Sequence, residues 1–431
     1  MAIKARVPFL LLSFLFLASL SVSSAWSSDS VSEKQENPFY FNSFKERYNS
    51  SMGYISLLQR FDQNNSILHG ITNYRLLSFK AVPRTFVVPH ITDADYIIYV
   101  MSGKLLFTLM YPDHTESYIL QPMDVLILPA GALAYVANVD EKETFEVMHL
   151  VIPLNIPGQF SDVFPGAEKT PLAFYHGFSN QTLEAAFNSP IEEIYQALLG
   201  EKEEDLKPDV LMEIPEKKIQ QLSHGANSSN QPNLPPSAPF NLGNHLIYSN
   251  DYGKVWEALP SQLPQIGEFG VAVTLTELNE GSLLLPHINS KGWLIAYVTK
   301  GDGVLEIAAP WRENEDSEHY GEIQAFSSQL SEGAAFAIPP GYPFSVKSSS
   351  NSTLGILGFV INAEKNKRIF AAGATNDVVN QIGHVAKPLI FTGTAKQVTQ
   401  LLAKQKGSYI VSAQPQLKKP PLSSILGSAF A

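Results

Sequence analysis

Short apolar runs separated by Gly, Pro, Asp and Asn follow one another through most of the chain, and one arrangement of these runs occurs twice. The first copy leads from Pro89-His90 to the turn Pro129-Ala130-Gly131, and the second from Pro286-His287 to Pro339-Pro340-Gly341. Glycine and proline at the corners of such runs are typical of consecutive antiparallel strands. Because the similarity appears at one large offset, it indicates a duplicated domain.

The first copy belongs to a longer series of runs that predicts a many-stranded β domain, and the same series returns from Pro239-Phe240 through Ile361. Strands this short and this frequent favour an all-β sandwich or barrel. A further strand is expected over Val210 to Ile214. The strands expected in the first half are Tyr54–Leu58, Tyr74–Phe79, Thr85–Val88, Tyr96–Met101, Leu105–Met110, Ser117–Leu120, Val125–Leu128, Ala134–Ala137 and Phe145–Ile152.

Helical periodicity replaces the strand pattern after the first β series. A short helix is expected over residues 182–187, and a second helix that Ser189 caps, with Pro190 at its first position and Glu192 in its first turn. Gly200 ends it. The apolar stripe of this arm consists of Ile191, Ile194 and Leu198.

The second half carries a matching helical arm. Asn376 is expected to cap a short helix, and Thr394 with Gln397 forms a capping box ahead of a helix that Gly407 ends. Its stripe consists of Val398, Leu401 and Leu402. Helices this short need a packing partner in water, so we expect both arms to join neighbouring copies of the chain.

These patterns predict an all-β protein with helical arms, built from two tandem β-barrel domains that are each followed by an αα arm. The 431 residues, 45% of them hydrophobic, are ample for two cores. The expected divisions are a signal peptide at 1–25, an N-terminal domain with its arm at 37–200, a linker at 201–237, a C-terminal domain with its arm at 238–410 and a flexible tail at 411–431.

The N-terminus predicts entry into the secretory pathway. Lys4 and Arg6 precede an apolar run over residues 7–20, and Ser23 and Ala25 provide the small residues of a cleavage site. No later stretch of the mature chain is long enough to span a membrane. Five glycosylation sequons fit that route, with Asn351 ranked first because it lies in an expected surface turn, and then Asn227, Asn180, Asn64 and Asn49.

Charge and cysteine content exclude several classes of function. A net charge of -11 disfavours a nucleic-acid partner, which needs a basic surface. The absence of cysteine removes both disulfides and thiolate metal ligands. The acidic run at 201–205 is interpreted as a solvated cluster in the linker.

Several separate segments resemble the cupin superfamily and, within it, the vicilins, which are the 7S seed globulins. The resemblance covers about residues 37 to 426. It is carried by Asn37-Pro38-Phe39-Tyr40-Phe41, Leu58-Gln59-Arg60-Phe61, Gly70-Ile71 with Asn73-Tyr74-Arg75, Pro286-His287 with Asn289-Ser290, Gly358-Phe359 with Ile361-Asn362-Ala363-Glu364 and Asn366, and Pro421-Leu422-Ser423-Ser424-Ile425-Leu426.

The resemblance implies two jelly-roll cupin barrels and a homotrimer joined head to tail through the arms. It also implies deposition in the protein storage vacuole of seeds, with the C-terminal segment as a sorting signal. An extracellular destination is the alternative.

Cupin enzymes hold a metal with three His and one carboxylate, and neither copy retains that set. In the first copy His90 remains, Thr92 and Ala134 replace the other two His, and Asp95 stands for the acid. In the second copy His287 remains, Asn289 and Phe344 replace the others, and Gly292 or Trp293 stands for the acid. Some vicilins bind copper through a Cys-x-His pair and a later His, and the matching positions here are Ala309-Pro310-Trp311 and Tyr342. We therefore expect no metal and no cofactor.

Two interpretations of the remaining His stay open. In the first, His90 and His287 are each buried and hydrogen-bonded within their barrel. In the second, a pocket for a small anion or sugar is lined by His90, His287, Asn289 and Tyr342.

No nucleophile or catalytic pair stands out, so the preferred hypothesis is a non-enzymatic seed storage globulin. The alternatives are a small-ligand binding protein of the sucrose-binding type and a residual metal-dependent oxidoreductase. A charged content of only 16% is low for a storage vicilin and keeps the first alternative open.

Overall fold

The computed structural model describes residues 37–63, 66–166, 173–199, 210–228, 235, 237–310, 321–375 and 377–415. Several sequence features lie outside these residues, and their predictions stay untested by the fold. They are the signal peptide at 1–25, the acidic run at 201–205, the sequon Asn64, the expected cap Asn376, Trp311 and the C-terminal segment 421–426.

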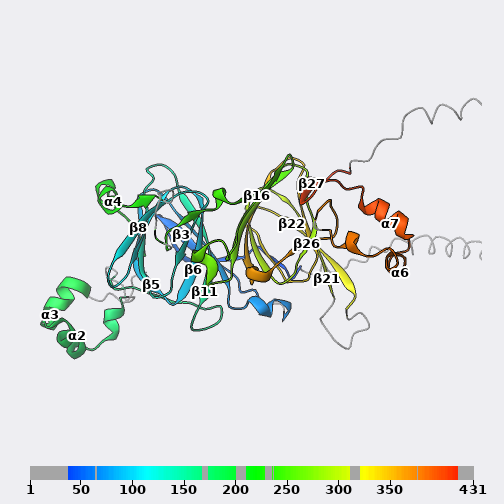
Figure 1. Cartoon of the computed structure of the whole chain (residues 1–431). Coiled ribbons are helices and arrows are strands. Elements are labelled where there is room, and N and C mark those ends of the chain that lie inside the picture. Colours follow the sequence, from blue (N-terminus) through cyan, green and yellow to red (C-terminus); the bar gives the residue numbers. More distant parts are fainter. Residues whose placement is uncertain are drawn as a thin grey trace, which may run out of the picture. The chain divides into compact units, whose positions relative to one another are not determined.

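Two β-sheets form the first barrel (Figure 1). Their strands pair antiparallel, except that β14 runs parallel to β8. One sheet has the order β12 (Asp162–Val163), β5 (Thr85–Thr92), β10 (Leu133–Asn138), β7 (Leu105–Met110), β8 (Thr115–Leu120) and β14 (Asn227–Ser228), with β13 (Leu211–Glu213) also on β5. The other has the order β15 (Phe240–Asn241), β9 (Asp124–Leu128), β6 (Ala94–Ser102), β11 (Phe145–Pro153), β4 (Arg75–Ala81), β3 (Gly53–Leu58) and β2 (Phe44–Ser50).

The second barrel repeats this order, so the predicted duplication is confirmed and β14 alone has no counterpart among the described strands. One of its sheets has the order β1 (Tyr40–Phe41), β23 (Ala335–Ile338), β20 (Trp293–Lys300), β25 (Leu354–Ile361), β18 (Ala272–Leu278), β17 (Gly253–Ala258) and β16 (Leu246–Asn250). The other has the order β22 (Ile323–Leu330), β21 (Gly303–Pro310), β24 (Phe344–Ser348), β19 (Ser282–Asn289) and β26 (Arg368–Phe370), with β27 (Ile410–Ser412) also on β19.

The two halves exchange their first strands. β1 comes from the start of the first half and pairs with β23 of the second barrel, where Tyr40 lies opposite Phe336. β15 comes from the start of the second half and pairs with β9 of the first barrel, where Phe240 lies opposite Val125. The expected domains, 37–200 and 238–410, assign each of these strands to the barrel that follows it in the chain. Their hydrogen bonds instead complete the other barrel.

Side chains from both halves share one hydrophobic core cluster, and a separate cluster fills the first barrel. Gly70, in the short helix η1 (Ser66–Ile71), lies against the indole of Trp293 in the second half. A Cβ at position 70 would come within 2.5 Å of Trp293 Cζ2, so only glycine fits without a shift. The adjacent Ile71 is completely buried in the shared core. The segment around Gly70, which supported the resemblance, therefore has a structural role in joining the halves.

The elements that the sequence pattern did not predict include the strand β2 and the helix α4. β2 carries Lys45 and Glu46 exposed and has only one neighbour, β3, so its composition lacks the apolar run of an inner strand. The helix α4 (Glu216–Ser223) lies within the expected linker and buries Ile219. The strand expected over Val210 to Ile214 is confirmed as β13. All nine strands expected in the first half are present, with bounds that differ by a few residues.

The helical arms form as expected, but the caps of the first arm differ from the prediction. In the first arm Ser179 caps α2 (Asn180–Phe187) by accepting from Thr182 N, whereas Pro190 occupies the N-cap position of α3 (Ile191–Ile194). Ser189 donates to a backbone oxygen instead. In the second arm, the capping box of Thr394 and Gln397 is confirmed at α7 (Ala395–Leu402). The other short helices are η2 (Phe174–Gly177), η4 (Leu242–Asn244), α5 (Pro264–Gly267), η5 (Ala363–Lys365), η6 (Val379–Gln381) and α6 (Lys387–Ile390).

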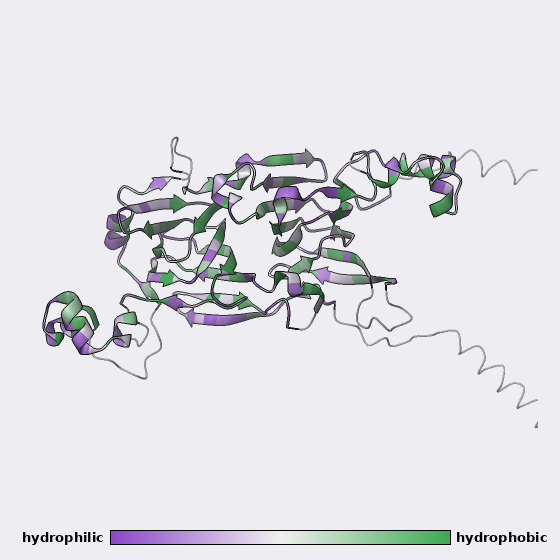
Figure 2. Ribbon diagram, turned by 60° about the horizontal axis from the view of Figure 1, so that its bottom comes forward, coloured by the Kyte–Doolittle hydropathy of each residue, from purple (hydrophilic) through white to green (hydrophobic). Residues whose placement is uncertain are grey.

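The predicted stripes divide between the inside and the outside of each arm. Ile194 and Val398 are buried within their own arms, whereas Leu198 and Leu401 are exposed. In the first arm α3 continues as a π-helix over Tyr195–Leu199, and its wider turn brings Leu199 inward in place of Leu198. Figure 2 shows hydrophobic residues along the barrel strands and a mixture of hydrophobic and hydrophilic residues on the arm helices. None of the helices in the described ranges has the length and apolarity to span a membrane.

Candidate functional site

The register of the barrel strands places the three positions that carry His in cupin enzymes. In the first barrel Ala134 on β10 lies directly opposite His90 on β5, and in the second Phe344 on β24 lies opposite His287 on β19. The side chains that replace the third His are therefore at the expected place. A methyl group and a phenyl ring donate no lone pair to a metal.

The remaining polar residues at these positions do not restore a metal site. Asp95 accepts a hydrogen bond from Ala130 N at 2.8 Å, so its carboxylate closes the Pro-x-Gly turn. Tyr342, in the position of a copper ligand, is buried with its ring edge-on to Phe39 at 5.9 Å. The described part of the chain contains no group of three or more His, Asp or Glu arranged to hold an ion. The donor set thus does not fit the metal of cupin enzymes.

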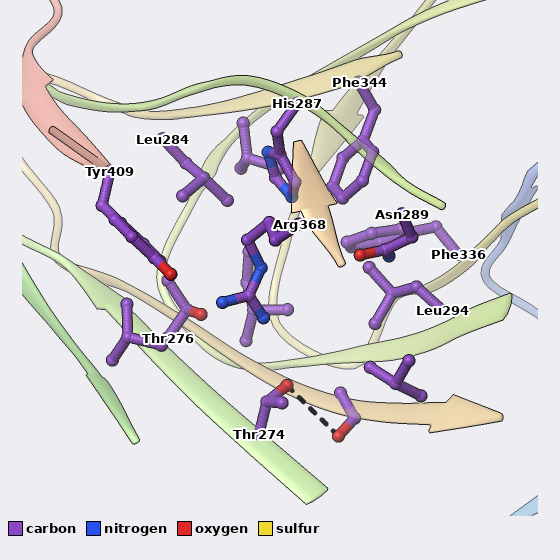
Figure 3. Close-up of a pocket in the computed structure, with 15 residues that line it drawn as sticks. Thr274, Thr276, Leu284, His287, Asn289, Leu294, Phe336, Phe344, Arg368 and Tyr409 are labelled. Carbon is purple, nitrogen blue, oxygen red and sulfur yellow. Dashed lines mark hydrogen bonds between the residues drawn. The ribbon is translucent and has the colours of Figure 1, made fainter. Parts of the chain in front are cut away.

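A small pocket, lined mostly by apolar side chains with a few polar groups among them, surrounds His287 inside the second barrel (Figure 3). The cavity has a volume of about 40 Å³. His287 is buried, and its Nδ1 lies 2.9 Å from the backbone oxygen of Leu285, which makes Nδ1 the donor and leaves Nε2 as an acceptor. Burial, together with the positive charge of Arg368, lowers the pKa of His287 to about 3. The imidazole is therefore neutral at physiological pH.

Arg368 on β26 supplies the positive charge of this pocket, and Figure 3 shows its guanidinium between His287 and the hydroxyl groups of Thr274 and Thr276. Its Nη2 donates to Glu257 Oε2 at 2.7 Å. Burial alone would lower the pKa of Arg368, but the charge of Glu257 and the contact with Tyr409 raise it above its usual value. A permanent cation with several donors thus lies beside a neutral imidazole.

Asn289 is held in this pocket by the loop that follows β25. Asn366 Nδ2 donates to Asn289 Oδ1 at 3.2 Å, and Asn366 Oδ1 accepts from the backbone nitrogens of Lys291 and Gly292. Asn289 is in turn the register partner of Arg368. The segment ending in Asn366, which supported the resemblance, therefore fixes the geometry of the pocket rim.

A larger groove adjoins the pocket of the second barrel. Its volume is about 650 Å³, and it shares Arg368, Tyr409 and Val360 with the pocket. Lys367 and Glu364 also line it. Arg368 therefore lines both the inner pocket and the larger groove.

The first barrel encloses a different cavity, of about 70 Å³, which His90 lines. His90 Nδ1 lies 3.0 Å from the backbone oxygen of Val88, as His287 does with Leu285. A second imidazole, His149 on β11, lines the same cavity. Arg47 and Asp162 form an ion pair of 3.1 Å beside them.

Of the four residues expected to bind a ligand, the structure brings His287 and Asn289 together, places His90 in the other barrel and leaves Tyr342 outside the lining of both cavities. Sequence reasoning missed Arg368, Glu257 and His149. For His149 the available signal was a titratable residue inside an otherwise apolar strand run, between Met148 and Leu150.

Comparison with known proteins agrees with this architecture. The profile of the cupin family matches residues 45–162 and 240–396. The β-conglycinin β subunit 1 of Glycine max is 38% identical over 444 residues, covering 99% of this chain and 100% of the relative. The vicilin of Pisum sativum is 38% identical and covers 96% of each chain. The crystal structure of the Solanum melongena vicilin, which revealed different anionic ligands in structurally similar pockets, matches with a TM-score of 0.79, 27% identity and coverage of 88% of this chain and 98% of that chain.

The two barrels and their altered ligand positions define a bicupin that lacks the metal-binding set of cupin enzymes. Within this class, the chain belongs to the vicilin family of 7S seed storage globulins. Its function is that of a seed storage protein, and the names of its relatives do not favour the sugar-binding alternative.

Proposed function

We propose that the protein is a homotrimeric nitrogen and carbon reserve without catalytic activity, deposited through the secretory pathway in the protein storage vacuole. The relatives support the storage role, and the pattern of the N-terminus supports the route. The barrels support the absence of catalysis, because Thr, Ala, Asn and Phe occupy the positions of the ligands on which cupin chemistry depends.

The exposed apolar side chains of the arms carry the trimer proposal. Within a single chain Leu198 is 44% exposed in the first arm, and Leu401 is 64% and Leu389 83% exposed in the second. Apolar side chains of this size gain about 1.5–3 kcal/mol each when a contact removes them from water. A first arm that meets the second arm of the next chain covers both surfaces, and such head-to-tail contacts close into a ring.

Light scattering of the purified protein at micromolar concentration tests the assembly. We expect a mass three times that of one chain, and the mass of a single chain would contradict the proposal. Immunogold labelling of maturing seed cells tests the destination separately. Label in the cell wall instead of the storage vacuole would contradict the vacuolar route.

Arg368 carries a second proposal, that the second barrel binds a small carboxylate anion. The guanidinium offers donors beyond the one given to Glu257, and Asn289 and His287 line the same cavity. A carboxylate matches the planar fork of arginine. The inner cavity, at about 40 Å³, has room for roughly three water-sized groups, which suits the carboxylate itself, and the adjoining groove accepts a longer tail. The anionic ligands of the Solanum melongena vicilin support the proposal.

Isothermal titration with propionate tests this site. We expect one binding event per chain that weakens as salt is raised, because chloride competes for the same cation. Heats equal to those of dilution at 100 mM ligand would contradict an anion site.

A further inference from the structure

The cavity of the first barrel has a polar lining unlike that of the second. Two acceptor atoms in it, His149 Nδ1 and Asp162 Oδ1, are buried and have no hydrogen-bond partner. Buried polar atoms are nearly always paired, and an unpaired one is destabilising. His149 and Asp162 both line this cavity, and each carries one such atom, which favours a bound molecule that donates hydrogen bonds.

The protonation state of His149 makes its unpaired nitrogen an acceptor. Burial lowers the pKa of His149 to about 3, so the ring is neutral and carries one proton. The backbone of Leu77 forms a hydrogen bond with the ring that favours a proton on the nitrogen facing it. Because Nδ1 is the unpaired atom, the proton lies on Nε2 and the lone pair on Nδ1.

Asp162 also lines this cavity and carries the second unpaired atom. Its Oδ2 is paired with Arg47 Nη2 at 3.1 Å, and Oδ1 remains without a partner. Arg47 also lies over the ring of Phe160, 4.5 Å from its centroid, so its guanidinium is held in place. A bound cation would be repelled by Arg47, and a bound anion would face Asp162 and a lone pair.

A donor complements these acceptors. The hydroxyl of Tyr96 accepts a long hydrogen bond of 3.5 Å from Thr92 and keeps its own proton. Apolar groups, including Phe107 and Ile98, form much of the remaining wall. The polar groups therefore suit a neutral hydroxyl, which both donates and accepts hydrogen bonds. The apolar part of the wall suits a short carbon chain.

We propose that the first barrel binds a small neutral alcohol, whose hydroxyl donates to His149 or Asp162 and accepts from Tyr96. The cavity of about 70 Å³ has room for roughly five water-sized groups, which corresponds to an alcohol of three or four carbon atoms. The first barrel would then bind an alcohol and the second a carboxylate. The proposal for the first barrel does not depend on anion binding at Arg368.

The experiment compares 1-propanol with propionate, which has a similar size but is an anion. Saturation-transfer NMR on the full-length protein measures binding in solution, and crystals soaked with each probe locate it. We expect propanol in the first barrel, with its oxygen within hydrogen-bond distance of His149 Nδ1 or Asp162 Oδ1. Propionate is expected to be absent from that cavity.

His149→Phe is the decisive variant, because it keeps the ring and removes the acceptor. Its affinity for propanol should fall roughly three- to tenfold, as for the loss of one hydrogen bond. His287→Phe makes the same change in the second barrel and should leave propanol binding unaltered. Tyr96→Phe, which removes the donor, should weaken binding by a similar factor.

Three outcomes would overturn the proposal. The first is water alone in the cavity of crystals soaked in propanol, and the second is occupancy in the crystal with no saturation transfer in solution, which is binding at crystal concentration only. The third is equal affinity in the wild type and His149→Phe. If His149→Phe fails to fold, Tyr96→Phe gives the same comparison.

Discussion

Asp162 and Arg368 occupy matched positions in the two barrels and carry opposite charges. Asp162 on β12 is the register partner of Thr92, and Arg368 on β26 is the register partner of Asn289. Thr92 and Asn289 are the residues that replace the second His of cupin enzymes. Each charge is paired with a residue from another strand, Asp162 with Arg47 and Arg368 with Glu257. The duplicated scaffold thus presents an acceptor to one cavity and a cation to the other.

Arg368→Met is expected to abolish propionate binding in the second barrel. The substitution also leaves Glu257 half-buried without its partner, which should lower the free energy of unfolding by about 1–3 kcal/mol. Glu257→Gln should act in the opposite direction on binding, because it leaves the charge of Arg368 unopposed. Titration calorimetry of both variants gives the comparison, and equal affinity in the two would exclude a role for the charge.

Leu401→Glu and Leu198→Glu are each expected to dissociate the trimer. Both side chains are exposed in the single chain, so a charge there leaves the fold intact. In the contact between arms, an unpaired carboxylate would lose its hydration, which costs several kcal/mol. Size-exclusion chromatography with light scattering should show single chains with unchanged circular dichroism. Gln196→Glu, at an exposed position of the first arm, is the control for charge alone.

Gly70→Ala is expected to destabilise the contact between the two halves. The new methyl group would lie 2.5 Å from Trp293, and overpacking of this kind typically costs about 1–3 kcal/mol. Gly177→Ala is the matched control, since no atom lies within 4 Å of its Cβ position. Urea unfolding followed by Trp fluorescence measures both. A Gly70→Ala protein as stable as the control would show that Trp293 moves aside without cost.

The free energy of unfolding is expected to decrease as the pH is lowered, because two imidazoles are buried in their neutral form. The pKa values of His149 and His287 are about 3 in the folded chain against an ordinary value of 6.5. Above pH 6.5 both states are neutral, so neither group contributes. Between pH 6.5 and 3 the unfolded chain binds protons that the folded chain excludes, so each group lowers the free energy of unfolding by up to about 1.4 kcal/mol per pH unit.

The double variant His149→Phe with His287→Phe should show a shallower decline. Urea midpoints measured from pH 7 to 4 give the two slopes. Parallel slopes for the wild type and the variant would mean that these imidazoles do not limit stability in acid.

Asn351 is expected to carry a glycan. It is exposed in the turn between β24 and β25, where a glycan buries no polar group. Asn227, in contrast, is only half exposed and lies in β14. Glycopeptide mass spectrometry of protein from seed should find Asn351 modified, and Asn351→Gln should lose that mass. Occupancy at Asn227 with Asn351 bare would reverse this order.

The strands and the duplication could be predicted from the sequence because each inner strand is an apolar run between turn residues. β2 could not, because an edge strand with Lys45 and Glu46 exposed has no such run. The burial of Leu199 could not be predicted either, because the pattern assumes α-helical spacing throughout, and a π turn shifts that spacing by one residue.

The site was predictable only in part. His287 and Asn289 lie on one strand, so their shared direction follows from the two-residue period. Arg368 enters the same pocket from a strand 79 positions later than Asn289, and only the register of β26 on β19 brings the two together. His149 likewise belongs to a different strand from His90, so its place in the cavity depends on the closing of the barrel.

The exchange of β1 and β15 affects how the reserve is made and broken down. Until residue 241 has left the ribosome, the first barrel lacks the edge strand β15 beside β9, so this barrel is incomplete during early synthesis. A peptidase that cuts only between the barrels leaves each half hydrogen-bonded into the other through these strands. Such a cut alone therefore leaves the strands of both barrels paired.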